Sequence, residues 1–273
     1  MARELAFEKW HGLRNDFVLV DEAVVSEQEA PRLARTVCDR RTGVGGDGLL
    51  LVGSNPARMR VWNADGTRPE MCGNGLRCVA AFIASRSGMS EPHFELSTDA
   101  GWRGVQVRKP VGAVWQVDVD MGVAREGIDG KGAFRLDHPV LGEGHVVDVG
   151  NPHWIFFGGA AERNWLLEHG QDAEHDARFP ARTNVEVVEE QPDGALRVTV
   201  WERGCGPTQA CGTGASAVGW LACALGRRAW GNALAVRLPG GELRITASED
   251  GAVSMSGPAE RVFAGILRLR ADE

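Results

Sequence analysis

The pattern of apolar and polar positions along the chain predicts more strands than helices. Short runs in which apolar residues alternate with polar ones, or follow one another directly, are typical of strands when glycine-rich turns bound them. The clearest are residues 17–20, 49–52, 114–119, 195–201, 234–238 and 243–246. The last two runs are joined through Pro239-Gly240-Gly241, a sequence that favours a hairpin turn.

Helical periodicity is found in three segments that lie scattered among the predicted strands. Residues 27–38 are amphipathic, and we expect Ser26 to cap this helix, with Glu29 strengthening its start. Residues 76–85 and 215–225 are rich in alanine and have a wide apolar face, so each is predicted to be a largely buried helix.

The two alanine-rich segments belong to an internal repeat. At an offset of 139 residues, Val61-Trp62-Asn63 matches Val200-Trp201-Glu202, and Cys72-Gly73-Asn74-Gly75 matches Cys211-Gly212-Thr213-Gly214. Each half therefore has a strand, a glycine-bearing loop, Cys-Gly-x-Gly and a buried helix. The halves are interpreted as copies of one α/β unit with a boundary near residues 118–125. The alternative is that glycine-rich turns coincide in a chain with 36 glycines.

A cysteine directly before a helix lies where backbone N–H groups are unpaired and the helix dipole is positive. This placement is expected to lower the pKa of the Cys72 and Cys211 thiols and to favour thiolates. The glycines that follow leave N–H groups open to a carboxylate. Two such loops could hold one carboxylate and present one thiol to each face of the adjacent carbon, as a racemase or epimerase without a cofactor requires.

Composition narrows the class of protein. The chain has 273 residues, 43% apolar and 25% charged, with a formal net charge of −7 and a pI near 5.6, which suits a globular protein of one large or two ordinary domains. The acidic balance argues against nucleic acid and anionic membranes as partners. Because the first residues contain no signal-like apolar region and no run of about 20 apolar residues occurs, we expect a cytoplasmic protein with reduced thiols.

Cofactor and metal motifs are not supported. The single Gly-Lys pair, Gly130-Lys131, is not followed by Ser or Thr, and none of the three lysines has the setting of a pyridoxal phosphate site. The Gly-x-Gly-x-x-Gly match at residues 43–48 follows a helix and precedes a strand, the reverse of a dinucleotide site. Cysteine spacings of five intervening residues do not fit structural zinc. We therefore expect no cofactor and no metal.

The six cysteines divide by position. Cys38, Cys78 and Cys223 lie on predicted helix faces and are expected to fill the core. Cys72 and Cys211 are the candidates for chemistry, and the role of Cys205, in the loop before Cys211, stays open. A thiol-based redox or metal-binding protein is the alternative that is not an enzyme.

The repeated motifs resemble those of the diaminopimelate epimerase family. The first signature runs from Asn63-Ala64-Asp65-Gly66 to Glu70 through Cys78, and the second from Trp201-Glu202-Arg203-Gly204 to Ala210 through Gly214. Further matches, in family order, are residues 11–17, 150–153, 183–186 and 257–259. The resemblance covers nearly the whole chain.

The resemblance implies an α/β (α+β) fold with two pseudo-symmetric lobes, each a curved, mostly antiparallel sheet around a central helix, and an active site in the inter-lobe cleft. The lobes would comprise residues 1–119, with 264–273 returning to them, and residues 120–263. It also implies a cytoplasmic, homodimeric isomerase without cofactor or metal that interconverts LL- and meso-diaminopimelate in lysine and peptidoglycan precursor biosynthesis. A racemase or epimerase of another amino acid, of the proline or hydroxyproline type, is the alternative on the same fold.

Site residues are carried over by position. Cys72 and Cys211 would be the catalytic acid and base, with Cys211 accepting and Cys72 donating a proton from LL to meso. His153 and Glu202 would tune the two thiols. The substrate would be bound by Asn15, Asn63, Gly73, Asn74, Asn151, Asn184, Glu202, Arg203, Gly212 and Thr213. Arg203 suits a carboxylate because its guanidinium donates two parallel hydrogen bonds.

Three positions depart from the pattern of the family. Gly48 stands where many members have glutamine, so a substrate contact of that side chain is absent from this position. The loop Gly204-Cys205-Gly206-Pro207-Thr208 lacks the usual glutamate and adds a cysteine and a proline. Phe263 stands where many relatives have a tyrosine linked to dimer formation.

Overall fold

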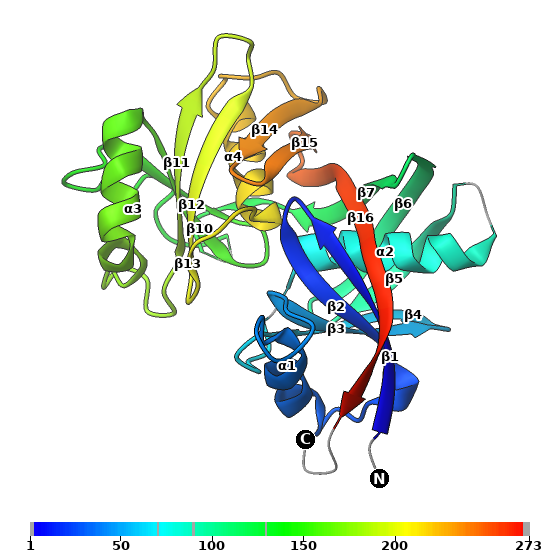
Figure 1. Cartoon of the computed structure of the whole chain (residues 1–273). Coiled ribbons are helices and arrows are strands. Elements are labelled where there is room, and N and C mark those ends of the chain that lie inside the picture. The colour runs from blue at the N-terminus through cyan, green and yellow to red at the C-terminus, as the bar shows by residue number, and fades with distance from the viewer. Residues whose placement is uncertain (1–2, 70, 89–90, 129, 270–273) are drawn as a thin grey trace. The chain divides into compact units, whose positions relative to one another are not determined.

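The computed structural model describes residues 3–69, 71–88, 91–128 and 130–269, which fold into two compact units (Figure 1). The first unit comprises Met1–Val119 and Gly257–Glu273, and the second comprises Asp120–Ser256. Glu70, which belongs to the first cysteine signature, lies outside the described residues.

The first unit is a mostly antiparallel sheet. Its strands are β1 (Arg3–Gly12), β2 (Asn15–Asp21), β3 (Gly48–Ser54), β4 (Ala57–Asn63), β5 (His93–Thr98), β6 (Gly101–Val111), β7 (Val114–Val123) and the second half of β16 (Ala252–Leu269). Strands β2 and β3 are parallel, as are β4 and β5, whereas β1 pairs antiparallel with both β2 and β16. Helix α2 (Gly73–Ser87) contacts β1, β2, β3, β4 and β6, and α1 (Ala30–Cys38) packs on β2, β3 and β4.

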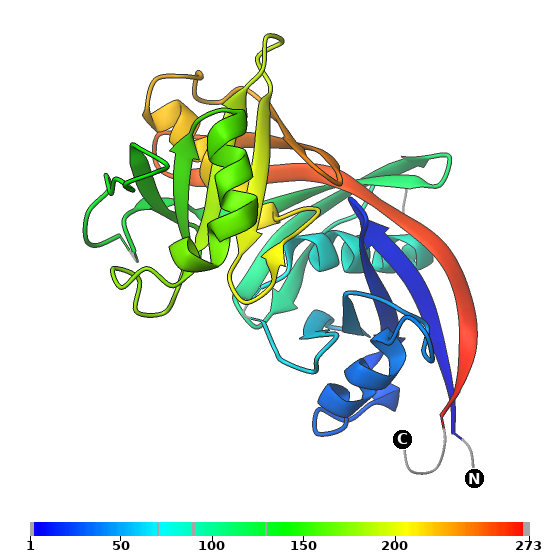
Figure 2. The same ribbon diagram turned by 60° about the vertical axis from the view of Figure 1, so that its left-hand side comes forward.

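The second unit repeats this plan. Its strands are β8 (Arg125–Glu126), β9 (Gly144–Asp148), β10 (Pro152–Phe157), β11 (Asn184–Glu190), β12 (Leu196–Glu202), β13 (Gly206–Pro207), β14 (Leu234–Leu238), β15 (Gly241–Ala247) and the first part of β16. Helix α4 (Gly212–Ala224) contacts β9, β10, β11, β14 and β15. Helix α3 (Ala160–Glu174) packs on β11 and β12, on the other side of these strands from α4 (Figures 1 and 2). A mostly antiparallel sheet around a central helix, expected for each half, is therefore confirmed.

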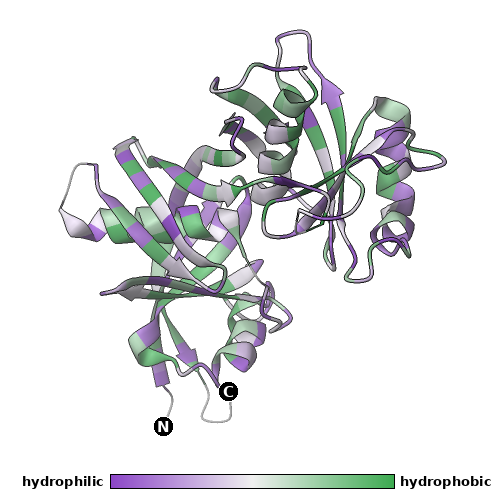
Figure 3. Cartoon of the chain, turned by 180° about the vertical axis from the view of Figure 1, so that it is seen from behind, coloured by the Kyte–Doolittle hydropathy of each residue, from purple (hydrophilic) through white to green (hydrophobic). Residues whose placement is uncertain are grey.

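The two central helices are buried because their sequences allow close packing from all sides. Every residue of α4 from Gly212 to Cys223 is buried, and most residues of α2 are too. At Gly219 an added Cβ would lie 2.5 Å from Cγ2 of Ile245, so only glycine lets α4 approach β15 this closely. Apolar and polar residues alternate along several surrounding strands, seen as green and purple bands in Figure 3, whereas β3 and β11 are buried along most of their length because α1 and α3 also pack on them.

Two helices differ from the sequence prediction. Helix α1 begins at Ala30 rather than at residue 27, and the turn before it leads directly into the helix, since the Ser26 carbonyl accepts from the N–H groups of Glu29 and Ala30. The Ser26 hydroxyl also accepts from the Glu29 N–H at 3.3 Å, as expected of a capping residue. Helix α3 was not predicted. Its buried residues include Leu166, Gly170 and Ala173, too few to give a clear apolar periodicity. Among the described residues no helix is long and apolar enough to cross a membrane.

Candidate active site

Cys72 and Cys211 are the N-cap residues of α2 and α4, respectively. Both have extended backbone conformations, with φ and ψ of −142° and 95° for Cys72 and −117° and 111° for Cys211. Each sulfur accepts a hydrogen bond from the backbone N–H three residues later, at 3.3 Å in both units. The repeat seen in the sequence therefore corresponds to two helix starts with the same local geometry.

The glycine at the third helical position allows this approach in both units. A Cβ at Gly75 would lie 3.2 Å from the sulfur of Cys72 and 3.1 Å from Leu50. A Cβ at Gly214 would lie 2.7 Å from Oε1 of Glu186 and 3.3 Å from the sulfur of Cys211. Gly214 is thus required by the close approach of the Glu186 carboxylate, and Gly75 avoids tight contacts with Leu50 and the Cys72 sulfur.

In the first unit, three asparagines predicted to bind substrate lie on neighbouring elements. Asn15 begins β2 and donates to Oδ2 of Asp47 at 3.2 Å. Asn63 ends β4 and donates to Oγ1 of Thr67 at 2.9 Å. Asn74, in the first turn of α2, is buried. Each side chain therefore has a partner within its own unit that fixes its orientation.

A cluster of charged residues supports Asn15. Lys9 lies 2.6 Å from Oδ2 of Asp16, and Arg40 donates to both carboxylate oxygens of Asp16 and to Asp47. Burial acts to raise the pKa of Asp16, but the hydrogen bonds from Arg40 and Lys9 outweigh it and hold this pKa well below its usual value. Asp47 is thereby held in place to accept from Asn15.

Arg77 is a residue to which the sequence assigned no role. It is fully buried in the second turn of α2, and it donates to Oδ1 of Asn74 at 2.8 Å and to the backbone carbonyl of Pro258 in β16 at 3.2 Å. Burial lowers its pKa to about 10. Arg77 therefore connects the helix start that carries Cys72 to β16, and it orients Asn74.

Position 48 leaves no room for the glutamine that the family resemblance implied there. A Cβ at Gly48 would lie 2.7 Å from the backbone carbonyl oxygen of Trp62 on β4 and 3.4 Å from Phe17. A larger side chain here would require the backbones of β3 and β4 to move apart.

In the second unit, Cys211 lies at one end of a series of buried polar contacts. Its sulfur is 3.4 Å from Oγ1 of Thr213, and Oγ1 accepts from Asn151 at 3.4 Å. Asn151 contacts Nε2 of His153 at 3.1 Å, and Nδ1 of His153 lies 2.6 Å from Oε1 of Glu186. The structure thus brings together Cys211, Thr213, Asn151 and His153, all predicted site residues. It adds Glu186, which was seen only as part of a motif.

Glu202, at the end of β12, faces the same thiol. Its carboxylate accepts hydrogen bonds from Thr208 and from Cys211. Burial raises the pKa of Glu202, and the hydrogen bond from Thr208 opposes this. Burial also raises the pKa of Cys211 well above its usual value, and the carboxylates of Glu202 and Glu186 add to the effect.

The expected lowering of the thiol pKa is therefore wrong for Cys211. The helix N-terminus does act in the predicted direction, since the Gly214 N–H and Thr213 favour the thiolate. However, removal of the sulfur from water and two nearby carboxylates outweigh it.

Asn184 and Arg203 are joined by a backbone contact. The side chain of Asn184 donates to the carbonyl of Pro152 at 2.9 Å and accepts from the backbone N–H of Arg203 at 3.0 Å. The Arg203 guanidinium donates to the carbonyl of Ala181 at 3.2 Å. Asn184 thus positions the residue that was predicted to bind a substrate carboxylate.

The loop after Arg203 is anchored by Glu174, which sequence analysis did not identify. This buried carboxylate at the end of α3 accepts from the Gly204 N–H at 2.8 Å, from Nε1 of Trp201 at 2.9 Å and from Arg182 at 3.0 Å. Cys205, next in the loop, is exposed. The departures from the family pattern therefore lie in a segment that one buried carboxylate holds in place.

The remaining cysteines are part of the core. Cys38, Cys78 and Cys223 are buried, as predicted. Among the described residues, no group of three or more His, Cys, Asp or Glu side chains is arranged to hold a metal ion.

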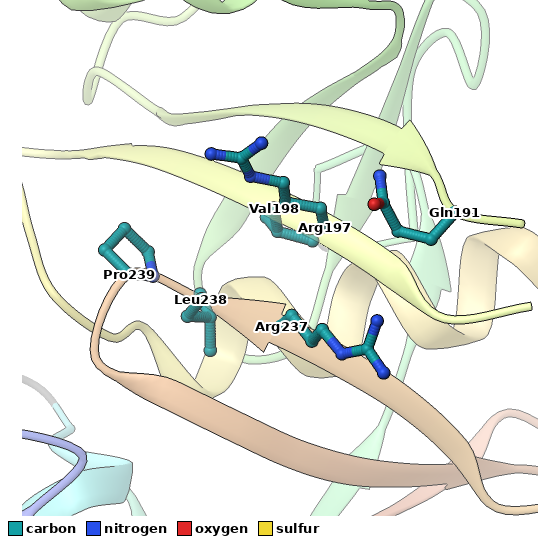
Figure 4. A pocket seen from close by; sticks show the side chains of 6 residues that line it. All are labelled: Gln191, Arg197, Val198, Arg237, Leu238 and Pro239. Atoms are coloured by element: carbon teal, nitrogen blue, oxygen red, sulfur yellow. The ribbon is translucent and has the colours of Figure 1, made fainter. Parts of the chain in front are cut away.

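A surface pocket of about 320 Å³ lies in the second unit (Figure 4). It is lined by Gln191, Arg197, Val198, Arg237, Leu238 and Pro239. Its Arg237 pairs with Asp193 and Glu242, and no predicted site residue lines it. The pocket is therefore separate from the candidate active site.

Comparison with known proteins shows the family of the chain. The family model described as "Diaminopimelate epimerase" matches residues 7–126 and 145–262. A diaminopimelate epimerase of Desulforudis audaxviator is 44% identical over 279 residues, covering 96% of this chain and 98% of that protein. One from Synechococcus elongatus is 40% identical over 285 residues, covering 98% of this chain and 99% of that protein.

Solved structures share the fold at lower sequence identity. A predicted epimerase from Pseudomonas aeruginosa has a TM-score of 0.73 at 17% identity, covering 96% of this chain and 99% of that one. A hydroxyproline epimerase from Agrobacterium vitis, solved with bound trans-4-hydroxy-L-proline, has a TM-score of 0.72 at 17% identity. The match covers 99% of this chain and 93% of that one. The family model matches most of the chain and relatives near 40% identity cover nearly all of it, and the chain therefore belongs to the diaminopimelate epimerase family of isomerases.

Proposed function

We propose that this protein interconverts LL- and meso-diaminopimelate by moving a proton at one α-carbon without a cofactor, with Cys72 and Cys211 as its two catalytic groups. The observation that carries this proposal is the pair of matched N-cap cysteines on repeated helix starts. It occurs in a chain whose relatives at 36–44% identity are named diaminopimelate epimerases. The activity serves lysine and peptidoglycan precursor biosynthesis.

The proposed reaction needs one thiolate and one thiol. In the LL-to-meso direction the Cys211 thiolate takes the α-proton, the electron pair of the C–H bond remains on the substrate, and the S–H of Cys72 delivers a proton to the other face of the carbon. One S–H bond forms and one breaks, so the two sulfurs exchange protonation states in each turnover. The reverse direction uses the same residues with exchanged roles.

The N-terminal turns of α2 and α4 supply the positive environment that this reaction requires. The negative charge that develops next to the substrate carboxylate is stabilised by backbone N–H groups at a helix start. We assign carboxylate binding at the reacting centre to Gly73, Asn74, Gly212 and Thr213. We assign the second amino-acid group of the substrate to Asn15, Asn63, Asn151, Asn184, Glu202 and Arg203. His153 and Glu202 tune the thiols, because Glu202 contacts Cys211 directly and His153 contacts it through Asn151 and Thr213.

Deuterium exchange tests the proposal directly. The reduced protein is incubated with LL-diaminopimelate in D₂O, and mass spectrometry and chiral chromatography follow the isotope and the isomers. We expect incorporation at one α-carbon with no added cofactor or metal. Cys72→Ser and Cys211→Ser should each lose more than about 100-fold in turnover, whereas Cys205→Ser, at an exposed thiol, serves as the matched control.

Two results would contradict the proposal. Undiminished turnover by either serine variant would remove its thiol from the reaction. The second result would come from a panel of substrates that includes proline and hydroxyproline. Turnover of one of these imino acids, with no deuterium exchange into diaminopimelate, would favour a racemase or epimerase of the proline or hydroxyproline type.

We also propose that the protein works as a homodimer in the cytoplasm. Apolar side chains on β16 support the dimer, since Val262, Phe263 and Ile266 are 54%, 46% and 65% exposed. A second copy that covers this strand would bury them. Light scattering after gel filtration should give twice the mass of the 29.4 kDa chain, and Ile266→Glu should reduce it to that of one chain. A reaction that needs one thiol and one thiolate favours a reducing compartment.

A further inference from the structure

We propose that Glu186 is a positioning residue for the acid–base chemistry of Cys211. It fixes the direction of the hydrogen bonds in a series of side chains that ends on the Cys211 sulfur. This inference rests on the proposed function, because it assumes that Cys211 exchanges a proton during turnover. Glu186 lies on β11, with its Oε1 close to Gly214 in the first turn of α4, and the effect proposed here reaches Cys211 through other side chains.

The first contact of the series is deeply buried. Glu186 and His153 have no exposed side-chain surface, and Oε1 of Glu186 lies 2.6 Å from Nδ1 of His153. Oε2 of Glu186 is buried and has no hydrogen-bond partner among the described residues. A carboxylate in such a site is costly unless an adjacent positive group or donor stabilises it. The His153 ring is the group placed to do so.

The following contacts continue to the thiol without a gap. Nε2 of His153 lies 3.1 Å from Oδ1 of Asn151, Nδ2 of Asn151 lies 3.4 Å from Oγ1 of Thr213, and this hydroxyl lies 3.4 Å from the sulfur of Cys211. Asn151 and His153 are two residues apart at the start of β10, and Thr213 is in the first turn of α4. Four consecutive contacts thus join Glu186 to Cys211.

The direction of each hydrogen bond follows from which atoms carry hydrogen. A carboxylate only accepts, so Nδ1 of His153 carries a hydrogen toward Glu186. Since Asn151 presents its carbonyl oxygen to Nε2, that nitrogen also carries a hydrogen. The amide group of Asn151 then donates to Thr213, and the hydroxyl hydrogen of Thr213 is left to point at the sulfur of Cys211. In this arrangement the last group of the series, the Thr213 hydroxyl, donates to the Cys211 sulfur and so stabilises its thiolate.

The same atoms also support the thiol. When Nε2 of His153 carries no hydrogen, the Asn151 amide turns over and donates to the ring, and its carbonyl accepts from Thr213. Thr213 then presents an acceptor to the sulfur and competes with the Glu202 carboxylate for the S–H of Cys211. No proton travels along the series; the amide and the hydroxyl only reverse direction. The structure holds the first arrangement, since Oδ1 of Asn151 faces Nε2 and Nδ2 faces Thr213, and the contact of Glu186 with Nδ1 fixes the ring orientation that this requires.

The charged groups near Cys211 also act on its thiol through space, and this effect favours the thiol, whereas the series of hydrogen bonds favours the thiolate. Burial and the carboxylates of Glu202 and Glu186 favour the thiol. On β9, which also packs on α4, Asp148 accepts from the Gly150 N–H and His145 packs on Phe134. The charged residues of β14 and β15 lie near one another; they are Arg237, Glu242 and Arg244. The two effects of Glu186, through the series and through space, therefore predict opposite outcomes when its charge is removed.

Glu186→Gln separates these two effects. Alkylation of Cys211 by iodoacetamide is followed against pH by peptide mass spectrometry, which distinguishes Cys211 from the exposed Cys205. If Glu186 acts through the series, the pH midpoint of alkylation rises by about one unit, and kcat falls about tenfold with little change in KM. If Glu186 acts only through space, the pH midpoint of Cys211 alkylation falls in Glu186→Gln. A midpoint that falls or stays unchanged would therefore overturn the proposal.

Matched variants test the series at its other end. Thr213→Val removes the last donor and should raise the same midpoint, whereas Thr213→Ser keeps the hydroxyl and should restore it. In the Glu186→Gln background, Thr213→Val should add less than about twofold to the loss in kcat, because both act on one series of contacts. Full multiplicative losses would refute the connection. The measurements on the single variants Thr213→Val and Thr213→Ser can be made even if Glu186→Gln does not fold.

The control is Glu189→Gln on the same strand, where the carboxylate pairs with Arg163 at 2.9 Å, and its midpoint should stay at the wild-type value. Failure of this inference can be distinguished from failure of the proposed function. In the first case the wild type exchanges deuterium and the midpoint in Glu186→Gln does not rise. In the second case the wild type itself shows no exchange.

Discussion

Replacement of Glu174 by glutamine should destabilise the second unit and disturb the loop that follows Arg203. Glu174 is 4% exposed in its side chain, and its two oxygens accept from the Gly204 N–H, Trp201 Nε1 and Arg182. Glutamine has nearly the same shape but offers an oxygen at one position only. Its NH₂ group must face at least one of these donors, which leaves that donor without an acceptor.

The size of the effect follows from these contacts. A hydrogen bond from a neutral donor to a charged acceptor contributes about 1.5–3 kcal/mol, and a buried donor without an acceptor costs about 1–3 kcal/mol. The pair with Arg182 adds little, since the Arg182 side chain is 47% exposed and water screens it. We therefore expect Glu174→Gln to lower the free energy of unfolding by about 3 kcal/mol, which corresponds to a fall in Tm of about 10 °C.

Calorimetry and steady-state kinetics on the full chain measure both consequences. Because Gly204 follows Arg203, we also expect kcat/KM for diaminopimelate to fall about tenfold at a temperature where the variant is folded. Glu168→Gln, at a 74% exposed position of α3, is the control and should change neither value. A fall in Tm of less than about 2 °C would refute the view that this carboxylate holds the loop.

Two further predictions concern the core. Gly219→Ala should lower the free energy of unfolding, measured in urea, by about 1–2 kcal/mol, because overlap with Ile245 exceeds the gain in helix propensity. In an Ile245→Ala background the same change should be neutral or stabilising. The same loss of stability in that background would contradict the overlap with Ile245. Burial raises the pKa of Cys38 from 9.0 to about 12, so the unfolded chain releases this proton first and stability should fall as pH rises from 9 toward 12. Unfolding curves of Cys38→Ala should lack this part of the decline, whereas Cys205→Ala should retain it.

The parts of the site that sequence predicts are those that depend on short segments. An N-cap cysteine followed by glycines and a small, apolar helix lies within about fifteen residues, so both helix starts and their equivalence could be predicted. Helix α3 could not, because it buries few side chains and carries Gly170 in its interior, where an added Cβ would lie 2.3 Å from the Trp201 ring. Its position depends on a contact with a distant strand.

The environment of the thiols could not be predicted for the same reason. A local argument from the helix N-terminus gives a lowered pKa for Cys211, but burial of the sulfur and the charges of Glu202 and Glu186, on two other strands, reverse the result. Glu174 and Arg77 were also overlooked, since an acidic or basic residue in a helix is ordinarily exposed to solvent. Only the three-dimensional packing distinguishes them from surface charges.

The N-cap role of the two cysteines links reactivity to the integrity of each helix. A sulfur that bears a negative charge accepts the N–H of Gly75 or Gly214 more strongly than a neutral one, so the helix behind it is held more firmly in the thiolate state. In the proposed reaction, the better-capped helix changes from one copy of the repeat to the other as a proton passes through the substrate from one sulfur to the other. The repeated helix start would thus, in the proposed reaction, stabilise the helix of each half in turn as the thiolate changes from one cysteine to the other.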